Sequence, residues 1–100
     1  MTPLYPDEPY ELVVAASASR AITDHLPEPV AWAAIDFINR PLLSNPYRVG
    51  APLENDLAGL YGHHLGDYRV VYRIDDENCV VEVLRIARRA DIYGLGQPGR

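Results

Sequence analysis

The fold is decided by residues 66–75, which read Gly-Asp-Tyr-Arg-Val-Val-Tyr-Arg-Ile-Asp. Apolar and charged side chains alternate along this stretch. Successive side chains of a β-strand point to opposite faces, so the alternation predicts a half-buried strand. One face would pack on a core through Tyr68, Val70, Tyr72 and Ile74. The other would be open and charged, with Asp67, Arg69, Val71, Arg73 and Asp75.

Two arginines therefore share the face that the pattern leaves open. Arg69 and Arg73 are four residues apart, and a guanidinium is a planar, permanently charged donor that suits phosphate. A solvated face with Arg–Asp pairs across it is the alternative interpretation. The strand taken alone favours this second reading.

Outward from this strand, composition and spacing predict five more elements. They are a strand at 10–16, a short helix from about 17 to 25, a helix from 29 to about 40, and strands at 57–64 and 80–86. The last three strands are joined by short turns, which favours an antiparallel meander. We expect an α+β fold of order β-α-α-β-β-β, with a mainly antiparallel sheet and two helices on one face.

The two predicted helices have recognisable signals. Ser17 or Ser19 could cap the short one, because a serine oxygen accepts from the first free amides. Pro41 should stop or kink the longer one. An apolar stripe, widened by Trp32 and Phe37, should face the sheet through Ala31, Ile35, Ile38 and Leu42.

Length and composition bound the possible functions. A chain of 100 residues is one domain, which we divide into a flexible lead-in (1–9), the folded domain (10–93) and a tail (94–100). The single cysteine, the lack of a signal peptide and the lack of a membrane span favour a cytoplasmic protein. All nine basic residues are arginine and the net charge is −5, which argues against broad, charge-driven binding of nucleic acid.

The candidate chemistry lies near the ends of the predicted strands. His63 and His64 are neighbours and should point to opposite faces of a strand, so we predict no shared metal site. One of them could face Arg69 and transfer protons near neutral pH. Arg89, preceded by Arg88, would converge with Arg69 if the last two strands are neighbours, and arginines so placed suit a phosphodiester. A basic cluster for an acidic partner is the alternative.

Four blocks of the sequence, in order, resemble the RelE/ParE superfamily of bacterial toxins, and RelE-type toxins in particular. The blocks are 45–53, 57–61, 66–75 and 86–93, and the resemblance covers roughly residues 10–93. It implies the toxin half of a type II toxin–antitoxin pair, a ribosome-dependent messenger-RNA endoribonuclease that needs no metal or cofactor. It also implies a RelB-like antitoxin, the ribosome and messenger RNA as partners, operator DNA only through the antitoxin complex, and no membrane.

The resemblance also implies roles for individual residues. Arg69 matches the arginine that stabilises the reacting phosphate, and Arg89 matches the arginine that supports the leaving group, with Arg88 as a possible replacement. Tyr93 matches a tyrosine that aids proton transfer or stacks on a base. Arg48 matches a basic loop position that contacts RNA.

Two features depart from the usual RelE pattern: the net charge of −5, where RelE toxins are usually basic, and the absence of lysine. The chain has no lysine, where RelE toxins commonly carry lysines in the second strand, so His63 or His64 is the candidate substitute. Arg73 joins Arg48 and Arg88 as a candidate RNA contact. Two alternatives stay open: a ParE-like inhibitor of DNA gyrase, and a weakly active relative that only binds its antitoxin and operator DNA.

Overall fold

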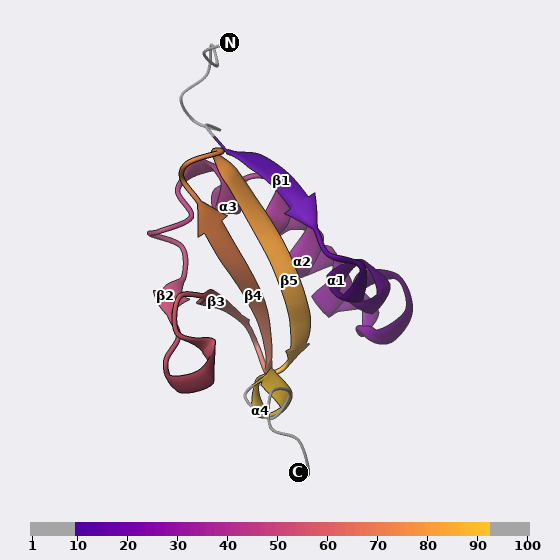
Figure 1. Ribbon diagram of the computed structural model, residues 1–100. Helices are drawn as coiled ribbons and strands as arrows, with labels where there is room; N and C mark the ends of the chain where they lie inside the picture. The colour runs from indigo at the N-terminus through magenta and orange to yellow at the C-terminus, as the bar shows by residue number, and fades with distance from the viewer. Residues whose placement is uncertain (1–9, 93–100) are drawn as a thin grey trace.

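The central strand is β4 (Tyr68–Asp75), as the alternating stretch predicts. The computed structural model describes residues 10–92. Its other strands are β1 (Glu11–Val14), β2 (Ala51–Pro52), β3 (Tyr61–Leu65) and β5 (Val80–Arg88). They form one five-stranded sheet in the order β1-β5-β4-β3-β2 (Figure 1).

The pairing confirms the predicted fold class. Strands β3, β4 and β5 form the antiparallel meander, and β2 adds a short antiparallel pair to β3. Strand β1 pairs in parallel with β5, so the sheet is mixed, and β5 is the interior strand that its apolar sequence predicts. The predicted lead-in and tail lie outside the described residues.

A helical layer covers one face of the sheet (Figure 1). It starts with α1 (Ala16–Arg20), which continues into a π-helical turn, η1 (Ala21–His25). The predicted serine cap is wrong, because the helix already begins at Ala16 and no side-chain cap bond forms at its start. Ser17 instead accepts a hydrogen bond from Arg85 Nη1 at 3.3 Å.

The longer helix, α2 (Glu28–Asn39), ends before Pro41, which starts the one-turn helix α3 (Pro41–Ser44), as predicted. Its buried residues are Ala34, Phe37 and Ile38. The prediction that Trp32 widens this apolar face is wrong, since its side chain is 60% exposed. Two residues turn an α-helix by about 200°, so Trp32 points away from the face that buries Ala34.

The main core lies between this layer and β4 and β5. On β4, Val70 and Tyr72 are fully buried against it, and Ile74 is partly buried. This confirms the predicted core face for three of its four residues. Tyr68, the fourth, is not part of the core cluster and lines a cavity at the start of the strand. The register shifts by one residue between Val71, which pairs with Arg85, and Tyr72, which pairs with Val83. This bulge keeps Val83 on the same face of β5 as Ile86.

The opposite face is less open than the alternation predicts. Val71 packs there with Leu53 and Ile92, and all three are almost completely buried. Leu53 comes from the loop that carries the short 3-10 helix η2 (Asn55–Leu57), and Ile92 comes from α4 (Arg89–Ile92). The second face is therefore apolar in its middle and charged toward its ends. None of the helices among the described residues is long and apolar enough to cross a membrane.

Candidate functional site

A cationic cavity lies where β4 begins and β5 ends, beside α4. Its volume is about 650 Å³, and it is lined by Asp67, Arg69, Arg88, Arg89 and Ala90. The antiparallel register places Arg69 opposite Ala87, and the amide of Arg89 donates to the carbonyl oxygen of Asp67 at 2.8 Å. These backbone contacts bring Arg69 together with Arg88 and Arg89, from two separate segments of the chain, at one site, which we call the arginine cavity.

Arg69 is the least exposed of these arginines, with 9% of its surface accessible. Its Nη2 lies 3.1 Å from His64 Nε2, and its buried Nε has no hydrogen-bond partner within residues 10–92. No carboxylate of the described residues forms an ion pair with it. A buried cation without a carboxylate is costly unless an anion completes its shell. The excess of guanidinium groups therefore suits this cavity to a negatively charged group.

The neighbouring strand makes room for this side chain. A Cβ placed on Gly62 would lie 2.9 Å from Arg69 Cδ and 3.1 Å from a methyl of Leu53. Glycine at position 62 thus lets the stem of Arg69 run over β3. Any larger residue there would have to displace Arg69 or the apolar cluster around Val71.

His64 faces Arg69 across the β3–β4 ladder. Because a guanidinium only donates, His64 Nε2 must accept, and the ring proton of the neutral form lies on Nδ1. Desolvation, followed by the charges of Arg69 and Arg89, lowers the pKa of His64 below its ordinary value of 6.5. His64 is therefore neutral at pH 7 and able to accept a proton at the edge of the arginine cavity.

His63 lies on the other face, as the alternation predicts for neighbours in a strand. Its ring stacks on Phe37 with centroids 3.7 Å apart, and its Nδ1 lies 2.8 Å from the carbonyl oxygen of Val49. These contacts tie the loop before β2 to the core. Within residues 10–92, no group of three or more His, Cys, Asp or Glu is arranged to hold a metal ion.

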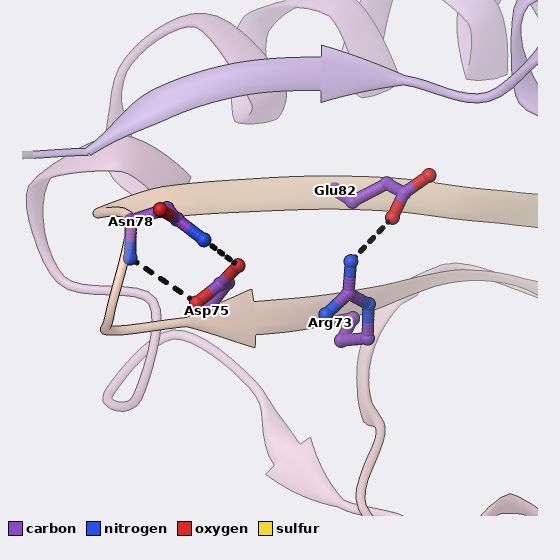
Figure 2. Close-up of polar contacts among 4 residues, drawn as sticks. All are labelled: Arg73, Asp75, Asn78 and Glu82. Atoms are coloured by element: carbon purple, nitrogen blue, oxygen red, sulfur yellow. Dashed lines mark hydrogen bonds and ion pairs between the residues drawn. The ribbon is translucent and has the colours of Figure 1, made fainter.

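The remaining predicted contacts lie elsewhere. Arg73 forms a 2.8 Å ion pair with Glu82, its partner on β5, nearer the opposite end of β4 from Arg69 (Figure 2). Arg48 is exposed and does not line the arginine cavity. It lies in the loop before β2, next to Val49, whose carbonyl oxygen contacts His63. Tyr93 lies outside the described residues.

Asp67 is the residue of this site that the sequence analysis did not single out. It lines the arginine cavity and its carbonyl oxygen holds Arg89 in place. The available signal was its position two residues before Arg69, on the same face of the same stretch. The contact of Asp67 with Arg89, just past the end of β5, joins two segments that are far apart in the sequence, so spacing alone does not predict it.

The comparisons with known proteins agree with this architecture. The family model described as "ParE toxin of type II toxin-antitoxin system, parDE" matches residues 17–93. The "Toxin RelE" of Mycobacterium tuberculosis is 49% identical over 89 residues, covering 89% of this chain and 91% of the relative. The "Toxin RelG" of the same organism is 41% identical over 85 residues, covering 85% of this chain and 97% of the relative.

Solved structures show the same fold. The toxin–antitoxin complex RelBE2 of Mycobacterium tuberculosis contains a chain with a TM-score of 0.72 and 38% identity, with 81% of this chain and 99% of that chain covered. A mutant of the Escherichia coli toxin RelE in the free state gives a TM-score of 0.67 at 25% identity, with 85% and 90% covered.

The sheet order, the helical layer on one face and the arginine cavity at the strand ends define a small α+β protein of the RelE-like fold. With the family match over residues 17–93 and the identity to the toxins RelE and RelG, the chain belongs to the RelE/ParE toxin family of type II toxin–antitoxin systems.

Proposed function

We propose that this toxin is a ribosome-dependent, metal-independent messenger-RNA endoribonuclease that a cognate antitoxin holds inactive. The observation that carries the proposal is the convergence of Arg69, Arg88 and Arg89 on one cavity, with Arg69 buried and unpaired with any carboxylate of the described residues. Identity to two toxins named RelE and RelG supports it.

The cavity suits cleavage of RNA by its own 2′-hydroxyl. The 2′ oxygen attacks the adjacent phosphorus, the bond from phosphorus to the 5′ oxygen breaks, and a cyclic 2′,3′-phosphate forms. Arg69 holds the phosphate and stabilises the charge that grows on it, and Arg89 supports the leaving oxygen. Because the substrate supplies the nucleophile, the reaction needs no metal-activated water.

In this proposal His64 takes the proton of the 2′-hydroxyl. It is neutral, it contacts Arg69, and it occupies the strand in which many RelE toxins carry lysine. We leave His63 out of the catalytic group, since its ring is stacked on Phe37 on the other face of β3. Tyr93 keeps its proposed role in returning a proton to the leaving oxygen or stacking on a base.

The ribosome dependence follows from charge. The chain carries a net charge of −5, and affinity for nucleic acid rises with the number of phosphates that a protein neutralises. A small arginine cavity on an acidic protein should hold free RNA weakly. The ribosome then has to present the message, and we propose accordingly that the protein acts in the cytoplasm.

A cognate, RelB-like antitoxin is the proposed protein partner. The Mycobacterium tuberculosis chain that is 38% identical to this one occurs in a toxin–antitoxin complex, RelBE2. Operator DNA would be bound through the antitoxin in such a complex.

The test compares free and ribosome-bound messenger RNA at equal enzyme concentration, with mapping of the RNA ends. We expect cuts within translated codons of the bound message and little cleavage of the free one. Arg69→Ala should lower the rate by about 10²–10³, the usual cost of one preorganised charge-stabilising donor. Arg40→Ala, at an exposed position after α2, is the matched control. Equal cleavage of free and bound RNA would contradict the ribosome dependence.

Inhibition of DNA gyrase is the second candidate, because the matching family model carries the ParE name. A toxin of that kind would leave messenger RNA intact and block supercoiling of relaxed plasmid DNA by purified gyrase. Supercoiling inhibition without RNA cleavage would favour it over the nuclease.

A further inference from the structure

A second cationic cavity lies beside the first, between the α1–η1 segment and the end of β5. Its volume is about 400 Å³. The residues that matter to its chemistry are Arg20, His25, Tyr68, Arg85, Arg88 and Asp91. Arg88 lines both cavities. We call this second site the flanking cavity.

The topology of the sheet creates this space. The last pair between β1 and β5 is Val14 with Val83, after which the chain leaves the sheet and enters α1. The part of β5 beyond Val83 therefore has no strand partner on that side, although β5 runs on to Arg88. The backbone of this free edge and the α1–η1 segment form two walls of the flanking cavity.

The π-helical turn η1 forms part of the second wall. In η1 the amide of Leu26 donates to the carbonyl oxygen of Ala21 at 2.9 Å, which is an i to i−5 bond. Such wide turns are rare and occur frequently at functional sites. Here the turn places both Ala21 and His25 along the flanking cavity.

The charges of the flanking cavity are unbalanced. It contains three guanidinium groups against one carboxylate, that of Asp91. Arg85 donates to Ser17 Oγ at 3.3 Å, while its buried Nε has no hydrogen-bond partner within residues 10–92. Among the described residues, none of these arginines forms an ion pair with an acid. Arg85 thus resembles Arg69, since both have a buried Nε that lacks a hydrogen-bond acceptor among the described residues.

Position relates the two cavities to one ligand. Tyr68 lines the flanking cavity, pairs in the ladder with Arg88, which lines both cavities, and directly precedes Arg69 in sequence, so the two sites are neighbours. A volume of about 400 Å³ accommodates a nucleotide-sized group, and the ring of Tyr68 offers a surface on which a base can stack.

We propose that the flanking cavity is a subsite for the nucleotide next to the cleaved phosphate. Arg20 and Arg85 bind its phosphate, Tyr68 contacts its base, and Arg88 bridges it to the arginine cavity. The subsite rests on the proposed RNA-cleaving function and extends it, since it determines how the strand is aligned before the cut.

The test is a titration of the full chain, labelled with ¹⁵N, with a 2′-O-methyl trinucleotide. This probe lacks the attacking hydroxyl, so it binds without being cut. The Nε–Hε resonances of the arginines report on each site separately and are assigned by single substitutions. We expect the resonances of Arg69 and Arg85 to shift together along one binding curve.

Arg20→Gln should raise the Kd of the trinucleotide about tenfold, the effect of losing one charge-assisted hydrogen bond. It should abolish the shift at Arg85 and keep the shift at Arg69. Arg20 is exposed, so its replacement leaves the core intact. Arg40→Gln, an exposed arginine after α2, makes the same change in net charge and should leave the Kd unchanged.

Three results would overturn the subsite. A shift at Arg69 without one at Arg85 would reject it and leave the nuclease proposal standing. An equal increase in the Kd of the trinucleotide for Arg20→Gln and Arg40→Gln would mean that Arg20 acts only through the net charge of the protein. Shifts at Arg85 with an Asp- and Glu-rich peptide, and at neither arginine with the trinucleotide, would assign the cavity to an acidic protein. Cleavage of ribosome-bound messenger RNA would still decide the nuclease proposal separately.

Discussion

Arg69 and His64 face each other from the adjacent strands β4 and β3, and their contact fixes which nitrogen of His64 accepts a hydrogen bond. Their side chains meet at 3.1 Å, from directly paired positions of β3 and β4. The guanidinium cannot lose its proton, so the imidazole remains the acceptor. This pair keeps a neutral base beside a fixed positive charge, which is the combination that removal of a hydroxyl proton beside a phosphate requires.

This coupling predicts a measurable pKa. The pKa of His64 should lie below 6.5, and Arg69→Gln should raise it, since the charge of Arg69 is a cause of the lowering. The folded state then binds this proton less readily than the unfolded state. The contribution of His64 therefore lowers stability as the pH falls below about 6.5, and it vanishes above that pH.

Titration of the imidazole C–H resonances measures this pKa directly. Arg40→Gln is the control for a change in net charge without a change at the site. An unaltered pKa in Arg69→Gln would mean that the two side chains are not in contact in solution.

Tyr72 is the residue on which the core face of β4 depends most. Its side chain is fully buried, and its hydroxyl donates to the carbonyl oxygen of Pro46 at 2.6 Å. Burial also raises the pKa of this phenol, so it stays a donor at neutral pH. Gly50 lies against the same hydroxyl, where a Cβ would collide with it.

We therefore expect Tyr72→Phe to lower the free energy of unfolding by about 1–3 kcal/mol, because the Pro46 carbonyl is left buried without its donor. Tyr72→Ala should lower it by about 3–5 kcal/mol, as for other large aromatic residues of a core. Urea denaturation measures both. Wild-type stability in the alanine variant would invert the assignment of the two sheet faces.

At the scale of elements, the β4–β5 turn connects three segments. Asp75 accepts hydrogen bonds from the backbone and the side chain of Asn78, which closes the turn (Figure 2). Asp76 accepts from Tyr10, just before β1, at 2.7 Å, and from Tyr47 in the loop after α3. The acidic run that reads as a solvated turn in the sequence thus ties β1 and that loop to the sheet.

Asp76→Ala should release both segments. We expect faster amide hydrogen exchange at Glu11, which donates to Cys79, and at Arg48, which donates to Asn45. Glu77→Ala, at the next and exposed position of the turn, is the control. Unchanged exchange at both amides in Asp76→Ala would show that the two phenol contacts do not hold these segments.

The same contacts give a pH window. Hydrogen bonds, first from Tyr47 and then from Tyr10, lower the pKa of Asp76 in the folded protein below its ordinary value of 3.8. The contribution of Asp76 to the free energy of unfolding is therefore present above about pH 3.8, and it is lost as the pH falls through the lower pKa of the folded state. The bonds to Asp76 raise the pKa of each phenol to about 12. The contribution of the two phenols to the free energy of unfolding is complete below pH 10 and disappears as the pH rises through about 12.

At the scale of the whole molecule, charge is separated along the sheet. The net charge is −5, yet both cationic cavities lie where β4 begins and β5 ends. The acidic turn lies at the other end of the same two strands. A negative protein can thus present a local positive potential to an anionic partner.

This separation predicts how an antitoxin binds. The segment that covers the arginine cavity should carry Asp or Glu, and raising the salt concentration should weaken that contact more than apolar contacts to the helices. Calorimetry of the complex at increasing salt, with wild type and Arg89→Gln, measures the difference. Arg40→Gln should keep the wild-type salt dependence. An identical salt dependence for all three proteins would mean that the antitoxin does not cover this cavity.

The sequence by itself determined the fold class and the main helices and strands, but not β2, η2 or α4 or the start of β3, which it placed at residue 57 instead of Tyr61. Alternation over residues 66–75 identified the central strand and its core face, and Pro41 marked the end of α2. Chain order and short turns identified the meander. These features depend on local periodicity and on backbone limits that each residue carries with it, so they can be read without knowing what lies opposite.

Only the tertiary structure decided what covers each side chain. It turned Trp32 outward, placed the ring of His63 on Phe37, and covered Val71 with a loop and α4. It also brought Arg20 and Arg85 to a cavity that shares Arg88 with the first. These outcomes depend on where β1 stops pairing with β5 and on how distant segments pack, and no spacing within one segment contains that information.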